Sequence, residues 1–429
     1  MRIRLLNPRK PDFLPAREPG EFREGRARGT RTPRGPSPLA VWLGKVWKQL
    51  AIYTNWPALA AILVLTGIGL VSIAADRRAD VSKQAAFLGV SLVAMAMFQA
   101  VNYQLLGRLA WGFYGLSLAL IGYTIIGVKL GLPGVRATKG AANWIYFGTF
   151  SFQPAELMKL AFIMVLARYL RFRSNYRSVK GLLAPFGIAA VPLLFIMKQP
   201  DLGTALVFIP VLFVMLFAAG AKLRHLLPIV AAAVMLVPLA WMCGTDVPVF
   251  RHLPPVIKGY QRERVIAMFS RDARTLRGTG FQQEHAMTAI GSGGFTGKGF
   301  GNIPVGQMVP EAHNDMIFAL VGEQWGLFGS AAVLIAYIVL FASGIEIAAN
   351  NRDPFGRLVA IGIIAMFAGQ AFINIMVSLR LMPVTGITLP FVSYGGTSLL
   401  ASYMAAGLLL NIGQNRPLVM ARDSFRFEE

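Results

Sequence analysis

Residues 201–220 read DLGTALVFIPVLFVMLFAAG, and after the first residue this stretch contains no charged side chain. A helix of about 20 mostly apolar residues spans the hydrocarbon core of a bilayer, so the stretch predicts a transmembrane helix. Similar runs continue along the chain on both sides of it, and one of them, residues 315–347, exceeds the length of a single crossing. The runs are residues 56–75, 84–101, 110–130, 154–170, 183–198, 201–220, 227–245, 315–347, 357–379 and 398–414. The predicted fold class is therefore an all-α integral membrane protein with about ten transmembrane helices.

The composition excludes an ordinary soluble protein. Of the 429 residues, 55% are hydrophobic and only 14% are charged, whereas soluble proteins contain about 25% charged residues. So few charges cannot cover the surface of several soluble domains. The single cysteine, Cys243, excludes an internal disulfide and a cysteine-rich metal site.

The net charge of +22 has two ordinary explanations, which are nucleic-acid binding and the positive-inside bias of membrane proteins. With the N-terminus in the cytoplasm, the inner segments hold 25 lysines and arginines, and the short outer loops hold seven. This distribution favours the membrane explanation over nucleic-acid binding. It predicts that both termini are cytoplasmic and that residues 246–314 form one large extracytoplasmic loop.

The chain is expected to have three parts. Residues 1–52 are basic and rich in arginine, proline and glycine, which is typical of a disordered tail. We expect this cytoplasmic tail to anchor the topology, with attraction to anionic headgroups or to a cytoplasmic partner as the alternative. Residues 53–415 are the predicted polytopic membrane domain, and residues 416–429 are a second cytoplasmic tail.

Two ionisable residues lie at the start of the run 154–170, and a charge inside a membrane costs about 2.5–3.5 kcal/mol. Glu156 and Lys159 are spaced i, i+3 and therefore share one helix face. Either they neutralise each other, or Lys159 points into an outward cavity and meets an anionic ligand. Upstream, Trp144 is an aromatic residue suited to a membrane interface. Asp201 is predicted to cap the following helix rather than to act in catalysis.

The outer loop contains an amphipathic stretch with Arg262 and Arg264 and a glycine-rich stretch at 291–301. A phosphate-binding loop requires Ser or Thr after Gly-Lys, but residue 299 is glycine, and a dinucleotide fingerprint requires a βαβ unit. Both nucleotide interpretations therefore fail. The glycine-rich stretch predicts a flexible re-entrant or interfacial loop, which at membrane depth has to line a cavity.

At the end of the outer loop, Glu311, His313 and Asp315 alternate before the chain becomes apolar. The alternation is compatible with a metal site, although no companion cluster accompanies it. Asp315 has two interpretations: an N-cap of the next helix, or a carboxylate at the floor of an outward cavity that accepts a proton. Glu323 lies deeper in the apolar run, and we expect it to be structural and to have a partner.

The last informative segment is LMPVTGITLPFVSYGGTS, residues 381–398. Two prolines and three glycines prevent a continuous helix here. Irregular backbone of this kind is stable at membrane depth only where protein or water surrounds it.

Taken together, these segments resemble the SEDS family (shape, elongation, division and sporulation), which includes peptidoglycan glycosyltransferases of the RodA and FtsW type. Residues 381–398 are the most specific match, followed by Pro-Glu-Ala-His-Asn-Asp at 310–315, and the resemblance covers about residues 56–415. Three further segments match, namely residues 152–159, 199–205 and 289–294. Residues 323–326 and 382–385 resemble RodA more closely than FtsW.

The resemblance implies an inverting glycosyltransferase that polymerises lipid II on the outer face of the bacterial cytoplasmic membrane, for cell-wall elongation and rod shape. A sugar hydroxyl needs a base, for which Asp315 is the candidate, and a diphosphate leaving group needs cations. The expected substrate-binding residues are Trp144, Glu156, Lys159, Arg262, Arg264, Glu311, His313 and Ser393. A class B penicillin-binding transpeptidase is the expected partner. We assign no metal ligands, and whether Mg²⁺ or Mn²⁺ bridges the diphosphate stays open.

Three other functions are compatible with the sequence. A lipid II flippase would also need broken helices and a basic cavity, although the charges of this chain lie near the outer edges of the spans. An FtsW-like septal polymerase would use the same chemistry in cell division. A non-catalytic scaffold for cell-wall assembly is the third alternative.

Overall fold

The computed structural model describes residues 37, 54–136, 142–148, 150–173, 178–243, 257–269 and 280–414. The chain divides into two units, residues 1–45 and 46–429, and every element below belongs to the second unit. Apart from Ser37, the predicted tails at 1–52 and 416–429 lie outside the described residues.

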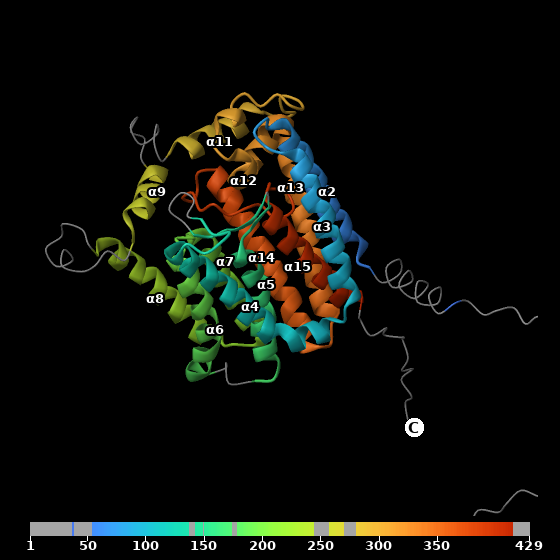
Figure 1. Ribbon diagram of the computed structural model, residues 1–429, viewed down its shortest axis with the longest axis vertical. Coiled ribbons are helices and arrows are strands. Elements are labelled where there is room, and N and C mark those ends of the chain that lie inside the picture. Colours follow the sequence, from blue (N-terminus) through green and yellow to red (C-terminus); the bar gives the residue numbers. More distant parts are fainter. Residues whose placement is uncertain are drawn as a thin grey trace, which may run out of the picture. The chain divides into compact units, whose positions relative to one another are not determined.

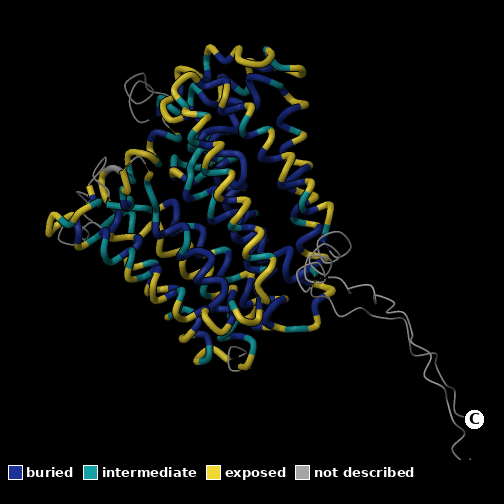
Figure 2. Tube along the Cα trace, turned by 45° about the vertical axis from the view of Figure 1, so that its right-hand side comes forward, coloured by how far each residue is buried: buried dark blue, intermediate teal, exposed yellow. Residues whose placement is uncertain are grey.

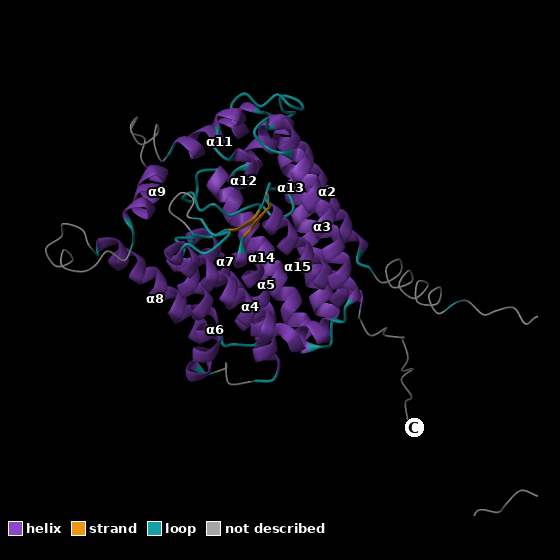
Figure 3. Ribbon diagram, viewed as in Figure 1, coloured by secondary structure: helices purple, strands orange, loops and turns teal. Residues whose placement is uncertain are grey.

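Long apolar helices make up the second unit (Figures 1 and 3). Among the described residues, nine helices are long and apolar enough to cross a membrane. They are α2 (Trp56–Ala75), α3 (Val81–Ala100), α4 (Tyr103–Leu130), α6 (Val179–Lys198), α7 (Leu202–Ala219), α8 (Leu223–Met242), α13 (Ile317–Asn350), α14 (Pro354–Ser378) and α15 (Gly396–Gln414). Each overlaps one of the predicted runs, which confirms the all-α membrane class.

The remaining predicted run is helix α5 (Pro154–Arg171), which differs from the others because it carries four charged residues. Fourteen of its 18 residues are buried. It packs against α4, α6, α7, α14 and α15, and Figure 2 shows that buried residues gather in the interior of the helices. A charged helix is tolerated at this place because protein, rather than lipid, surrounds it.

Helix α8, in contrast to the buried helix α5, is almost entirely exposed. Leu226 is its one buried residue, and the helix lies at the edge of the bundle (Figure 1). An apolar helix with an exposed surface of this kind is typical of a segment that faces lipid. The short helix α9 (Gly259–Phe269) follows α8 along the chain.

Helix α13 explains why the run 315–347 is too long for one crossing. The helix bends at Gly326, where φ is 61° and ψ is −147°. A Cβ atom at Gly326 would lie 2.5 Å from the Gly297 nitrogen and 2.6 Å from the Gly294 oxygen. The glycine-rich stretch therefore packs directly against the bend, where glycine allows the two backbones to approach closely, and its flexible, re-entrant or interfacial character stays a prediction.

Glu323, one turn before the bend, holds the same loop in place. Its side chain is fully buried and its Oε1 atom lies 2.6 Å from Lys298 Nζ. The backbone N–H groups of Val305 and Gly306 donate to the same carboxylate at 3.1 and 2.6 Å. The predicted structural role of Glu323, with a partner elsewhere, is confirmed.

The connections that surround the candidate site are short and irregular. Strands β1 (Ile145–Phe147) and β2 (Phe150–Phe152) form an antiparallel hairpin before α5. Helix α11 (Phe281–Ser292), the 3₁₀ turn η2 (Gly306–Met308) and the short helix α12 (Ala312–Asp315) precede α13. Figure 3 shows the hairpin near α12. The segment between α14 and α15 is non-helical, as its prolines and glycines predict.

Candidate active site

Two adjoining cavities lie where these connections meet. The Asp315 chamber has a volume of about 270 Å³ and the Arg264 chamber about 480 Å³. Their walls share Trp144 and Gln153, from the hairpin region, and Gly386, from the connection between α14 and α15. A molecule that occupies both chambers would therefore pass between these three residues.

Asp315 is the last residue of α12 and lines the smaller chamber. The N-cap position of α13 is Met316, one residue further along the chain, and the Met316 side chain forms no cap bond. Asp315 thus lies one residue before the N-cap position of α13, and its assignment as a base stays a prediction. A Cβ atom added at Gly386, where φ is +76°, would lie 3.7 Å from Asp315 Oδ2. The glycine keeps the approach to the carboxylate open.

Arg264 and Arg262 lie on α9 but have different surroundings. Arg264 lines the larger chamber, and its Nη1 atom donates to the Val384 carbonyl at 3.0 Å. Arg262 donates to the Cys243 carbonyl, and its guanidinium lies 6.0 Å from the centre of the Trp241 ring. Only Arg264 of the two contributes a cation to the chambers in the described residues.

Glu156 and Lys159 form an ion pair inside α5. Lys159 Nζ lies 2.7 Å from Glu156 Oε1, and the side chains of Lys159 and Glu156 are 5% and 8% exposed. In the described structure, neither residue lines the two chambers. The geometry is that of mutual neutralisation, one of the two interpretations offered by the sequence.

Asp201 connects the region around Glu156 and Lys159 with the two chambers. It caps α7, as predicted, by accepting hydrogen bonds from the backbone N–H and the hydroxyl of Thr204 at 2.9 and 2.8 Å. Gln153, a wall residue, donates to its Oδ2 atom at 2.9 Å. Burial raises the pKa of Asp201 above its usual range, and the nearby Glu156 carboxylate acts in the same direction.

The remaining predicted contacts lie outside the two chambers. His313 is buried, and its Nδ1 atom lies 2.9 Å from Asp76 Oδ2. Glu311 is exposed and accepts from Asn314 at 2.7 Å. The Ser393 hydroxyl accepts from the Leu389 N–H at 2.8 Å, which stabilises a turn. Among the described residues, no three His, Cys, Asp or Glu side chains are grouped so that they could hold a metal.

One functional candidate is absent from the sequence prediction. Lys83, in the first turn of α3, lines the Asp315 chamber. Its backbone N–H donates to Asp80, the N-cap residue of α3, at 3.1 Å. The available signal was its position at the edge of a predicted span, but a single lysine there is equally typical of an outer loop.

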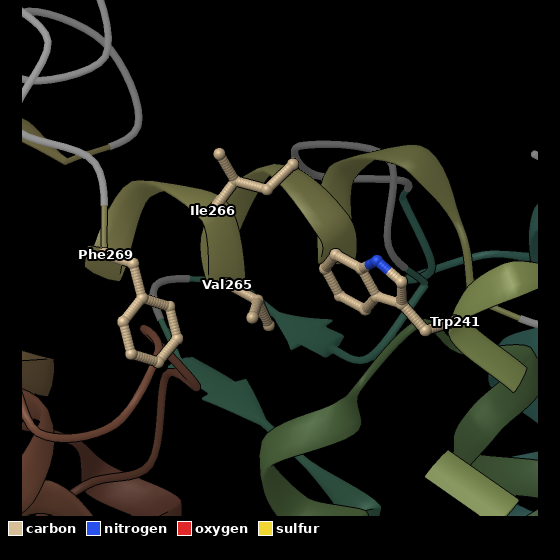
Figure 4. Close-up of a pocket in the computed structure, with 4 residues that line it drawn as sticks. All are labelled: Trp241, Val265, Ile266 and Phe269. Carbon is tan, nitrogen blue, oxygen red and sulfur yellow. The ribbon is translucent and has the colours of Figure 1, made fainter. Parts of the chain in front are cut away.

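An apolar groove continues from the larger chamber toward α8. It has a volume of about 490 Å³ and is lined by Trp241, Val265, Ile266 and Phe269. Trp241 and Val265 also line the Arg264 chamber. Figure 4 shows Val265 and Phe269 on the same side of α9. The groove thus joins a polar chamber to an apolar, exposed helix.

The fold and the chambers define a polytopic membrane protein with a polar site at one end of its helices. Residues 49–417 match the sequence profile of the FtsW, RodA and SpoVE cell cycle proteins. The chain belongs to this family.

Relatives with different names are similar to this chain. Stage V sporulation protein E of Bacillus subtilis is 36% identical over 367 residues, which cover 82% of this chain and 94% of that protein. The probable peptidoglycan glycosyltransferase FtsW of Geobacter metallireducens is 34% identical over 331 residues, covering 76% and 82%. The closer resemblance to RodA therefore stays a prediction.

Two solved structures share the fold. A chain from a study of polymerization and crosslinking by a peptidoglycan synthase complex superimposes with a TM-score of 0.71 at 29% identity, covering 85% of this chain and 99% of that chain. The rod shape determining protein RodA of Thermus thermophilus gives 0.62 at 27% identity, covering 86% and 99%.

Proposed function

We propose that the protein is a peptidoglycan glycosyltransferase that polymerises lipid II on the outer face of the bacterial cytoplasmic membrane. Relatives in its family bear the name probable peptidoglycan glycosyltransferase. The observation that carries the proposal is the pair of adjoining chambers, one with the carboxylate of Asp315 and the other with the guanidinium of Arg264. Glycosyl transfer between two lipid-linked sugars needs a base and a cation close together.

In the proposed reaction, Asp315 accepts the proton of a sugar hydroxyl on the acceptor. The hydroxyl oxygen forms a bond to the anomeric carbon of the donor, and the bond from that carbon to the diphosphate oxygen breaks. Undecaprenyl diphosphate leaves with the bonding electron pair, and attack from the opposite face inverts the anomeric centre. Lys83 and Arg264, the cations of the two chambers, stabilise the charge that develops on the leaving group.

The apolar groove between α8 and α9 suits the lipid part of such a substrate. Its side chains are apolar, whereas the chamber beside it offers polar groups such as Gln261 and Arg264. A polyprenyl chain in the groove would keep its diphosphate next to these groups. A soluble sugar nucleotide has no lipid chain that could occupy the groove.

Elongation and rod shape are our preferred cellular role, and an FtsW-like septal role has equal support from the relatives. We also propose both termini in the cytoplasm and a class B penicillin-binding transpeptidase as partner. The similar chain from a peptidoglycan synthase complex supports that partnership. The flippase alternative has less support, because both chambers lie at helix ends rather than in mid-membrane.

Glycan polymer formed from lipid II by the purified protein alone, in liposomes, tests the proposal. Lys83→Ala and Arg264→Ala should each lower polymer yield strongly. Arg77→Ala is the matched control for Lys83, because Arg77 is an exposed cation of the connection just before α3 and lines neither chamber. Lipid II flipping without polymer would instead support a transporter, and activity that requires the transpeptidase would support a scaffold.

A further inference from the structure

The turn that carries Asp315 has a strained backbone, which needs contacts from other elements to keep its conformation. Helix α12 has only four residues, and Glu311 before it has φ 55° and ψ 30°. A non-glycine residue in this left-handed region costs of the order of 1–3 kcal/mol and persists only where its surroundings fix it. The position of the Asp315 carboxylate therefore depends on contacts from other elements.

The first such contact reaches α12 from the turn between α2 and α3. The fully buried Asp76 carboxylate accepts from His313 Nδ1 at 2.9 Å, and His313 lies two residues before Asp315. Arg78 donates two hydrogen bonds to the same carboxylate, from Nε to Oδ1 at 3.0 Å and from Nη2 to Oδ2 at 3.2 Å. Arg78 Nη2 also donates to the Val309 carbonyl at 2.9 Å. Asp76 thus holds the His313 side chain of α12 directly, and through Arg78 it also holds the backbone that leads into α12.

The second contact comes from α14. Asn374 is 1% exposed, and its Nδ2 atom donates to the Asp315 carbonyl at 2.7 Å and to the Ile387 carbonyl at 2.8 Å. Ile387 follows Gly386, which lies opposite the Asp315 carboxylate. One amide group therefore sets the spacing between the carboxylate and the wall that faces it.

The two contacts converge on the same connection between α14 and α15. The Tyr394 N–H donates to the His313 carbonyl at 2.8 Å, and the Tyr394 ring lies edge-on to the His313 ring at 5.3 Å. Tyr394 lines the Asp315 chamber. A shift of α12 would consequently move both the carboxylate and the opposite wall.

We propose that Asp76 and Asn374 are positioning residues for glycosyl transfer, which together hold the Asp315 carboxylate at its place in the chamber. The inference rests on the proposed function, because it assigns the purpose of the contacts to the reaction of Asp315. Catalysis depends steeply on such placement, since a misplacement of about 1 Å can cost about 100-fold in rate. Neither residue lines the chambers in the described structure.

The test uses size-matched variants of the full-length protein in liposomes with lipid II. Asp76→Asn leaves only one good acceptor for both Arg78 and His313, and Asn374→Leu removes both donated hydrogen bonds. Asp353→Asn is the control for the first, because Asp353 caps α14 and pairs with Arg171 at 3.2 Å. Asn411→Leu is the control for the second, because Asn411 Nδ2 donates to the carbonyls of Phe98 and Gln99, both at 2.9 Å.

We expect kcat to fall about 10- to 100-fold in the two test variants, with KM for lipid II nearly unchanged. The controls should keep their kcat even where their melting temperatures fall as far. Equal kcat in test and control variants would overturn the inference, and so would a loss expressed only in KM. Asp315→Asn, measured in parallel, separates the two proposals: if it stays active, the assignment of the base fails whatever the test variants do.

Asn374→Asp gives a second readout if Asn374→Leu does not insert. A neutral carboxyl can donate one hydrogen bond to a carbonyl, whereas a carboxylate can donate none. The activity of Asn374→Asp relative to that of the wild type should therefore rise as the pH falls. A ratio that falls as the pH falls would contradict a positioning role.

Discussion

Lys159 Nζ and Glu156 Oε1 lie 2.7 Å apart within helix α5, and the two side chains are almost completely excluded from solvent. Removing one partner of a buried pair leaves an uncompensated charge, which costs about 3–5 kcal/mol. We therefore expect Lys159→Ala to lower both the melting temperature and the polymer yield. The exchange Glu156→Lys with Lys159→Glu should restore more of each than either single change.

A loss of activity without a loss of stability would instead indicate that Lys159 binds the substrate. In that case Lys159→Ala would keep the wild-type melting temperature but lose activity, and the exchanged pair would stay inactive. Lys159 would then have to leave Glu156 to reach the diphosphate. Melting temperature and polymer yield, measured on the same preparations, distinguish these outcomes.

Asp76 makes the stability of the protein depend on pH. Burial raises the pKa of this carboxyl, but hydrogen bonds from His313 and Arg78 outweigh burial and hold its pKa well below the usual range. The charged form therefore stabilises the fold above the unfolded pKa of about 4, and this contribution is lost as the pH falls below that value. The melting temperature of Asp76→Asn should fall less steeply with acidification than that of the wild type.

Gly326 should tolerate no side chain. Alanine there would need a positive φ and would place Cβ 2.5 Å from the Gly297 nitrogen, so Gly326→Ala should destabilise the protein by at least about 1–3 kcal/mol. Gly112→Ala is the control, because a Cβ atom there meets nothing within 4 Å. It should be neutral or slightly stabilising, since alanine favours helix more than glycine does. Equal melting temperatures for the two variants would contradict the bend at Gly326.

The orientation of the chain can be tested by cysteine labelling. In a Cys243→Ala background, Asn175→Cys should resist a membrane-impermeant reagent in intact cells, because it lies in a predicted cytoplasmic segment. A cysteine at position 302, in the predicted outer loop, should react. Labelling of position 175 from outside would reverse the topology derived from the 25 inner and seven outer basic residues.

The sequence predicts local features well and distant contacts poorly. Apolar length locates the spans, and the residue types around Asp201 predict its cap, because both depend on neighbours in the chain. The pairing of His313 with Asp76 joins residues 237 positions apart, and no local pattern indicates it. The bend at Gly326 is equally hidden, since the apolar run continues across it.

At the candidate site, too, the sequence predicts local features but not the contacts between distant residues. Asp315 stands out because a carboxylate enters an apolar run, whereas Lys83 is one of several lysines and arginines at span edges. The predicted cations Arg262 and Arg264 lie on one short helix, yet the fold turns only Arg264 toward a chamber among the described residues. Residue type and spacing thus suggest the chemistry, but helix packing decides which side chains meet.

The most direct measurement is the rate of lipid II polymerisation by purified Asp315→Asn in liposomes. Asparagine keeps the shape of the side chain but cannot take up a proton usefully, so the rate should fall by about 100- to 10,000-fold. Insertion, melting temperature and lipid II binding should stay close to those of the wild type. A stably folded Asp315→Asn that polymerises lipid II at the wild-type rate would contradict the assignment of Asp315 as the base, and Glu311 would be the next residue to test.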